Sequence, residues 1–96
     1  MPIRFRVVDL LEVKIDQYRV ASFDGRVLEI FGGSVRRFPG ELLSVTGSRP
    51  DKKGNRDVTL TQSARDDALP LDEPQFDGFQ PLLDALRRVG VKVDCP

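Results

Sequence analysis

Alternating apolar and polar positions characterise the N-terminal part of the chain. In residues 3–7 and 11–15 the odd positions are apolar and the even positions are charged. A period of two places successive side chains on opposite faces of a strand, so the pattern predicts half-buried β-structure. Asp9 interrupts the apolar parity, and we expect a bend, a bulge or a turn there. A helix over residues 10–18 is the competing interpretation, but the longer run of strict alternation favours strands.

Tight turns divide the next part of the chain into short strands. Four runs rich in β-branched and aromatic residues follow one another: 18–23, 26–31, 34–38 and 41–46. Asp24-Gly25 separates the first two runs. This dipeptide is typical of a hairpin with a type I′ turn, in which both central residues have positive φ. Gly32-Gly33 and Pro39-Gly40 mark the following turns, so the sequence predicts a meander of four short strands.

A polar stretch follows the meander. Residues 47–57 have almost no apolar content and contain proline and glycine, which predicts a long exposed hairpin loop. Residues 57–62 alternate again and form the next predicted strand. In the irregular segment that follows, Leu69 and Leu71 are placed to supply a short edge strand.

The period changes from two to about 3.6 near the C-terminus. Six apolar residues form a broad stripe on one face of a predicted helix: Phe76, Phe79, Leu82, Leu83, Leu86 and Val89. Asp77 with Gln80 fits a capping box at its start, and Pro81 at the first helical position is the alternative. Gly90 follows the last apolar position, as expected of the residue after the C-cap. Residues 91–94 are expected to run along the sheet edge.

These elements predict a single, mostly β domain over residues 1–96. A bent antiparallel sheet or partial barrel of six to seven strands is expected, capped by one C-terminal amphipathic helix. Such a sheet needs a cover for its apolar inner face, and the helix stripe supplies one. We therefore expect the helix to be buried in the fold, and its loss should unfold the domain.

The composition favours one modest core and a strongly solvated surface, because 40% of the 96 residues are hydrophobic and 31% are charged. The formal net charge is zero, so no overall charge steers the chain toward nucleic acid. Residues 49–56, the basic loop, carry four basic side chains and one acidic one. Residues 66–77 carry five acidic side chains and no basic one. Two copies could meet basic loop to acidic segment, and solvated loops are the alternative interpretation.

The order of elements resembles the pleckstrin-homology-like superfamily in its bacterial and GRAM-like variants. The stretch FDGRVLEIFGGSVRRFPGELLSV (Phe23–Val45) looks like the strand, turn, basic strand and buried strand of bacterial members. FDGFQPLLDALRRVGV (Phe76–Val91) looks like their closing helix. The resemblance implies a strongly bent seven-stranded antiparallel sheet closed by that helix. It also implies a binding role, toward phosphoinositides in some members, peptides or proteins in many, and further copies of the chain in some bacterial oligomers.

One departure from the family concerns phosphoinositides. The lipid-binding branch uses a lysine near the first hairpin, followed later by a Lys/Arg-x-Arg motif. Lys14 and Arg19 lie near such a turn, but Val20 and Ala21 follow Arg19, so the second half of the motif is missing. The resemblance therefore does not extend inositol-phosphate binding to this chain.

The chain offers few groups for catalysis. It contains no histidine, which removes the commonest general base and metal ligand, and its one cysteine, Cys95, has no base partner identifiable in the sequence. Asp66-Asp67 and Asp72-Glu73 lack the spacing of an EF-hand loop, and we interpret them as solvated surface. The turn glycines match no phosphate-binding motif. We expect neither an enzyme nor a bound metal or cofactor.

A cytoplasmic location is expected. One cysteine cannot form an internal disulfide, so the fold does not require an oxidising compartment. No apolar run approaches the roughly 20 residues of a membrane span. Residues 1–10 lack the apolar region of a signal peptide.

The basic loop is the one candidate binding site, with four basic residues: Arg49, Lys52, Lys53 and Arg56. Such a loop can attract a phosphate-bearing membrane or nucleic acid, but no aromatic residue lies among them for base stacking. The leading hypothesis is a non-enzymatic binding or assembly module. It would bind a protein partner, or self-associate into a homo-oligomer, through a sheet edge or face. Binding of an anionic surface through the basic loop is the alternative.

Overall fold

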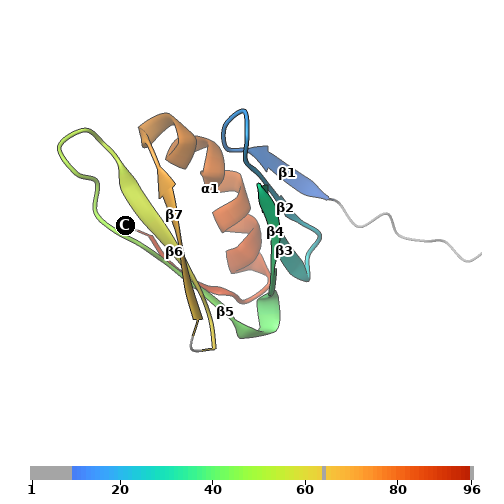
Figure 1. Cartoon of the computed structure of the whole chain (residues 1–96). Coiled ribbons are helices and arrows are strands. Elements are labelled where there is room, and N and C mark those ends of the chain that lie inside the picture. Colours follow the sequence, from blue (N-terminus) through green and yellow to red (C-terminus); the bar gives the residue numbers. More distant parts are fainter. Residues whose placement is uncertain (1–9, 64, 96) are drawn as a thin grey trace, which may run out of the picture.

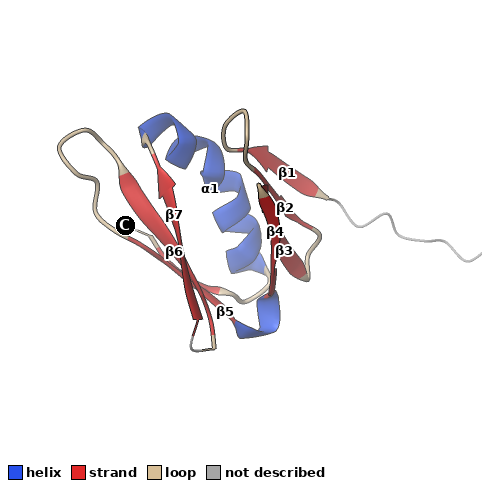
Figure 2. Ribbon diagram, viewed as in Figure 1, coloured by secondary structure: helices blue, strands red, loops and turns tan. Residues whose placement is uncertain are grey.

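The computed structural model describes residues 10–63 and 65–95. These residues contain eight strands, one α-helix and one short 3-10 helix (Figure 1). Strands dominate, and the α-helix lies near the C-terminus (Figure 2). The predicted mostly β fold with one C-terminal helix is confirmed. The strand predicted over residues 3–7 and the bend at Asp9 lie outside the described residues.

The strands form two four-stranded sheets. Sheet A is an antiparallel meander of β1 (Leu11–Lys14), β2 (Val20–Phe23), β3 (Val27–Gly32) and β4 (Ser34–Pro39). Sheet B has the order β7-β6-β5-β8 and consists of β5 (Leu43–Gly47), β6 (Arg56–Gln62), β7 (Arg65–Leu71) and β8 (Lys92–Asp94). β8 runs parallel to β5, whereas β6 runs antiparallel to both β5 and β7. The helix α1 (Glu73–Arg88) lies between the two sheets (Figure 1).

The chain leaves sheet A at Pro39-Gly40, where the 3-10 helix η1 (Gly40–Leu42) begins. The N–H of Gly40 donates to the carbonyl oxygen of Arg26 at 2.7 Å. A Cβ on Gly40 would lie 3.1 Å from that oxygen, so the close approach favours glycine. The turn redirects the chain, and β5 pairs with β6 instead of β4. The predicted single bent sheet or partial barrel of six to seven strands is therefore wrong. The described residues form eight strands in two sheets, neither of which closes into a barrel.

The core lies between the sheets and receives side chains from both of them and from α1. Five helix residues are buried in it: Phe76, Phe79, Leu82, Leu83 and Leu86. The predicted apolar stripe is confirmed at these five positions. Val89 is the exception, because it is the C-cap residue and is 51% exposed. Full burial of one such side chain is worth about 1.5–3 kcal/mol, so α1 contributes a large share of the core energy.

The helix begins one turn earlier than predicted. Asp72 is the N-cap: its carboxylate accepts the N–H of Gln75 at 2.8 Å, and the Gln75 side chain accepts the N–H of Asp72 at 2.9 Å. The predicted box of Asp77 with Gln80 is wrong, and Pro81 lies inside the helix instead of at its start. Both boxes have the same spacing, so the local pattern could not choose between them.

The C-terminal end of α1 agrees with the prediction. Gly90 has a φ of 91°, in the left-handed region that favours glycine. The N–H of Gly90 donates to the carbonyl oxygen of Arg87, and the N–H of Val91 donates to that of Leu86. These two bonds form a Schellman motif. The strand β8 follows at once along the edge of sheet B, as predicted for residues 91–94.

The hairpin between β2 and β3 forms at the predicted place but with a different turn. A type I′ turn needs positive φ at both Asp24 and Gly25, and only Gly25 has one, at 96°. The Asp24 carboxylate instead accepts the N–H groups of Val27 and Arg26, each at 2.8 Å. Phe23 pairs with Leu28, so the connection is longer than a two-residue type I′ turn, and the side-chain bonds within it hold the pKa of Asp24 below its usual value.

The alternation expected in the strands is confirmed. In β1, Val13 is buried while Glu12 and Lys14 are exposed. Leu69 and Leu71 belong to the edge strand β7, as predicted, and both are buried; this strand is longer than expected and covers seven residues.

Replacing Asp72 with alanine removes the N-cap of α1 and should lower the free energy of unfolding by about 1 kcal/mol. Asp77→Ala is the matched control, because it removes an exposed carboxylate from the same helix without touching the cap, and it should change stability by less than about 0.5 kcal/mol. Urea denaturation followed by circular dichroism measures both variants. Equal losses would contradict the assignment of Asp72 as the N-cap.

Candidate functional site

The loop between β5 and β6 is exposed over most of its length, as predicted, and a compact set of hydrogen bonds holds it. At its base, the N–H of Ser48 donates to the Asp57 carbonyl oxygen, and the N–H of Asp57 donates to Ser48 Oγ, each at 2.9 Å. At its tip, the Asp51 carboxylate accepts the N–H of Lys53 at 2.8 Å and that of Asn55 at 2.9 Å. An aspartate that binds several backbone N–H groups stabilises a turn. The loop therefore presents its side chains from a defined backbone.

The basic loop packs on the first turns of α1. The guanidinium carbon of Arg56 lies 3.9 Å from the centroid of the Phe76 ring, which is a cation–π contact. Gly54 has a φ of 83° and contacts Glu73: a Cβ on Gly54 would lie 3.0 Å from a carboxylate oxygen of Glu73. Both the backbone conformation and the close approach favour glycine there. The position of the loop therefore depends on the helix.

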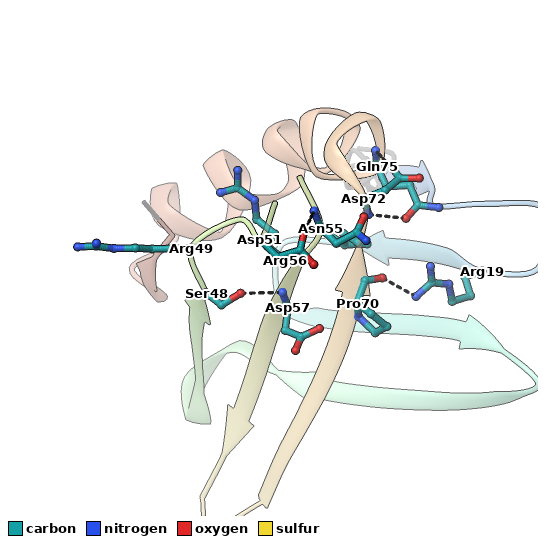
Figure 3. A pocket seen from close by; sticks show the side chains of 11 residues that line it. Arg19, Ser48, Arg49, Asp51, Asn55, Arg56, Asp57, Pro70, Asp72 and Gln75 are labelled. Atoms are coloured by element: carbon teal, nitrogen blue, oxygen red, sulfur yellow. Dashed lines mark hydrogen bonds between the residues drawn. The ribbon is translucent and has the colours of Figure 1, made fainter. Parts of the chain in front are cut away.

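A groove of about 470 Å³ lies between the basic loop, the end of β7 and the N-terminus of α1 (Figure 3). Three arginines and three aspartates are among the residues that line it: Arg19, Arg49, Arg56, Asp51, Asp57 and Asp72. Arg19 reaches the groove from the turn before β2 and donates to the carbonyl oxygen of Pro70 at 3.1 Å. The same Arg19 side chain donates to Asp16 in the turn before β2. The bond that Asp16 accepts from the N–H of Tyr18, together with this one, lowers the pKa of Asp16. The charges of the groove balance, so it does not concentrate positive charge.

The four candidate anion-binding residues take different positions. Arg56 is half-buried against Phe76, and Arg49 extends away from the other labelled side chains (Figure 3). Lys52 and Lys53 are exposed and are not part of the groove lining. The local sequence does not predict the contact between Arg56 and Phe76, because the ring belongs to another element. Anion binding by this loop stays a prediction.

The acidic pair at the start of β7 is engaged in surface contacts. Asp66 accepts a hydrogen bond from the Thr61 hydroxyl at 2.8 Å. Asp67 lies 3.5 Å from the guanidinium of Arg36 and 3.8 Å from that of Arg65. In the described part of the chain, no group of three or more cysteine, aspartate or glutamate side chains is placed to hold a metal ion.

An apolar surface on sheet A was not anticipated from the sequence. Val20, Phe31 and Val35 lie directly opposite one another on β2, β3 and β4, and opposite residues share a face of the sheet. Phe31 is 37% and Val35 is 52% exposed, so this is the face directed away from the core. Tyr18 is 77% exposed, and its backbone lies beside the row, since its carbonyl oxygen would be 3.4 Å from a Cβ on Gly32.

These four residues, Tyr18, Val20, Phe31 and Val35, are the outer apolar patch. The turn at Gly32-Gly33 explains why the pattern alone missed it. A two-residue turn at those glycines would pair Phe31 with Ser34, whereas the observed turn at Gly33, with a φ of 75°, pairs Phe31 with Val35. A shift of one residue in register changes which side chains meet across the strands.

No helix in the described residues is long and apolar enough to span a membrane. Comparisons with protein-family models, with curated proteins and with solved structures found no significant match. The chemistry of the chain's own surfaces therefore has to carry any functional conclusion.

Replacing Arg56 with alanine should lower the free energy of unfolding by about 1 kcal/mol, because the guanidinium packs on the Phe76 ring. Arg49→Ala removes the same kind of side chain from an exposed position of the same loop and should cost less than about 0.5 kcal/mol. Urea denaturation of the two variants and the wild type measures the difference. A loss at Arg56 no larger than that at Arg49 would contradict a structural role for Arg56.

Proposed function

We propose that this chain is a non-enzymatic binding or assembly module of pleckstrin-homology-like architecture. It binds a protein partner, or a second copy of itself, through a sheet edge or an exposed sheet face. The order of elements supports this proposal: a four-stranded antiparallel meander, three further antiparallel strands and one amphipathic helix. In this proposal β1 to β7 would correspond to the seven strands of that architecture, and β8, which pairs with β5, would be an addition.

The outer apolar patch is the observation that carries the proposal. The side chains of Val20, Phe31 and Val35 lie in one row on the outer face of sheet A, and the backbone of the exposed Tyr18 lies beside this row. The next row of the same face is polar, and Glu29 and Arg37 form an ion pair across it at 3.0 Å. An apolar centre with a polar border is typical of a protein-binding surface.

The chemistry of the chain supports a binding role over catalysis. No histidine is present, and Asp66, Asp67 and Asp72 engage in a helix cap and in surface contacts. We therefore propose no cofactor and no metal. Phosphoinositide recognition is not proposed, because the motif after Arg19 is incomplete. The lone cysteine supports a cytoplasmic location.

One observation favours a second candidate function, the binding of an anionic surface. The Asp51 turn holds the basic loop in a fixed backbone with Lys52 and Lys53 exposed. Together with Arg49 and Arg56 they would meet the phosphates of a lipid surface or a nucleic acid. Each charge near an anionic membrane is worth about 1 kcal/mol.

The double variant Phe31→Ser, Val35→Ser should reduce capture of a protein partner by about tenfold or more, because it removes the centre of the patch without changing a core side chain. Immobilised wild-type and variant chains are compared by quantitative affinity capture from a lysate of the organism that encodes the chain. Leu42→Ser, Val89→Ser is the matched control, since these residues are also exposed, at 59% and 51%. Identical captured proteins from all three chains would reject the patch as the binding face.

The double variant Lys52→Glu, Lys53→Glu should weaken binding to phosphatidylserine-containing vesicles, or to a nucleic-acid duplex, by about tenfold or more if the basic loop is the binding site. Vesicle co-sedimentation and fluorescence anisotropy measure the two ligands separately. Arg26→Glu, Arg88→Glu makes the same change of charge at exposed positions elsewhere. The anionic-surface function is rejected if the loop variant binds as the wild type does, or if both variants lose binding equally.

A further inference from the structure

Sheet B ends at β8, whose outer edge pairs with no strand of the described chain. On its inner side, residues 92–94 pair in parallel with residues 44–46 of β5. An edge strand presents unpaired backbone N–H and C=O groups, and these pair with another strand unless the sequence opposes it.

The sequence of β8 is complementary to itself. Lys92 and Asp94 are exposed and share one face of the strand, while Val93 faces the core. When two such strands pair antiparallel about a two-fold axis at Val93, Lys92 of each copy lies opposite Asp94 of the other. Opposite charges in directly facing positions stabilise an antiparallel pair. The next positions outward, Val91 and Cys95, are both apolar.

The same edge has apolar surface left to bury. Val93 and Cys95 pack against the core but are only half-buried. A second strand beside β8 would cover both side chains. Burial already raises the pKa of the Cys95 thiol, and a neutral thiol behaves as a small apolar group.

Two other edges carry features that oppose pairing. Arg36 and Arg37 occupy the centre of β4, so an antiparallel self-pairing centred on either residue would place that arginine opposite its own copy. In β7, Pro70 has no N–H, and its carbonyl oxygen already accepts a hydrogen bond from Arg19 at 3.1 Å. Charged residues and proline are typical of sheet edges that are protected from pairing with another chain.

The edge of β1 is the competing one, because Glu12 and Lys14 flank Val13 with the same complementary charges. On its core side, Leu11 is partly buried, and Val13 and Ile15 are only 9% and 5% exposed. Pairing there would bury little further apolar surface at Val13 and Ile15, whereas pairing at β8 would cover two half-buried side chains.

We propose that the edge of β8 is a homodimer interface, at which two copies pair antiparallel and join their B sheets into one continuous sheet. The partner is a second copy of this chain. The inference rests on the proposed assembly function and specifies which partner and which sheet edge take part in it. The interface is small, so the dimer is expected to form only at micromolar concentration or above.

Light scattering after size-exclusion chromatography, over about 10 to 500 µM chain, tests the dimer in the presence of a reducing agent. The wild type should shift from monomer to dimer over this range. Lys92→Asp and Asp94→Lys each place like charges opposite one another and should raise the dissociation constant by roughly tenfold or more. The double variant Lys92→Asp, Asp94→Lys restores opposite charges and should dimerise as the wild type does. A mixture of the two single variants should form a heterodimer.

Glu12→Lys and Lys14→Glu at β1 are the matched controls and should leave the dimer intact. If they dissociate it while the β8 variants do not, the β8 interface is wrong and self-assembly itself stands. A monomeric wild type over the whole range overturns the β8 dimer, and the capture experiment at the outer apolar patch then decides the proposed function separately. A dimer that dissociates when the reducing agent is added would depend on a disulfide between the two Cys95 residues. That result would also overturn the β8 dimer, because Cys95 faces Val91 of the other copy in the proposed register.

Discussion

The apolar face of α1 is the contact on which the rest of the structure depends. The two sheets share no hydrogen-bonded strand pair in the described residues, so their apolar inner faces meet through the helix between them. Five buried helix side chains, each worth about 1.5–3 kcal/mol, supply an energy comparable with the whole net stability of a small domain. Both ends of α1 are correspondingly well defined, by the capping box at Asp72 and the Schellman motif at Gly90.

The helix also positions two of the surfaces considered for function. The basic loop rests on Glu73 and Phe76, so the groove beside it exists only where the first turns of α1 are in place. At the other end, the chain turns at Gly90 directly into β8, which brings the edge of that strand beside β5. The outer apolar patch is different, because it lies on the face of sheet A that does not touch the helix.

The chain has no net charge, so local arrangement decides how its surfaces interact. In the groove, arginines and aspartates balance, and Arg56 is used to hold the loop on the helix. At the sheet edges, the order of charged residues along a strand decides whether a second copy would meet like or opposite charges. At β4 a self-pairing centred on Arg36 or Arg37 would bring two arginines face to face, whereas lysine and aspartate on either side of Val93 face opposite charges in a second copy. Within the described residues, the exposed aromatic side chains are Tyr18 and Phe31, and both belong to the outer apolar patch.

Local patterns in the sequence predicted most of the elements. Alternation identified β1 and the strands that follow it, and the glycine at position 90 marked the end of the helix. These signals act within a few residues of one another, so the sequence alone contains them. The apolar stripe of α1 and its burial followed from the same reasoning.

Contacts between distant residues decided the rest. The sequence offers two capping boxes of equal spacing, and the helix begins at Asp72, so that Phe76 belongs to the helix and is buried; a start at Asp77 would have left Phe76 outside it. The turn at Gly33 selected the register that places Phe31 opposite Val35 and creates the outer apolar patch. The burial of Phe76 brought its ring under Arg56, a contact that fixes one residue of the predicted basic cluster on the helix. By itself the sequence determined where strands and helix form, because local geometry suffices for that. Only the tertiary structure decided which faces and edges remain exposed, because exposure depends on what packs against each residue from elsewhere in the chain.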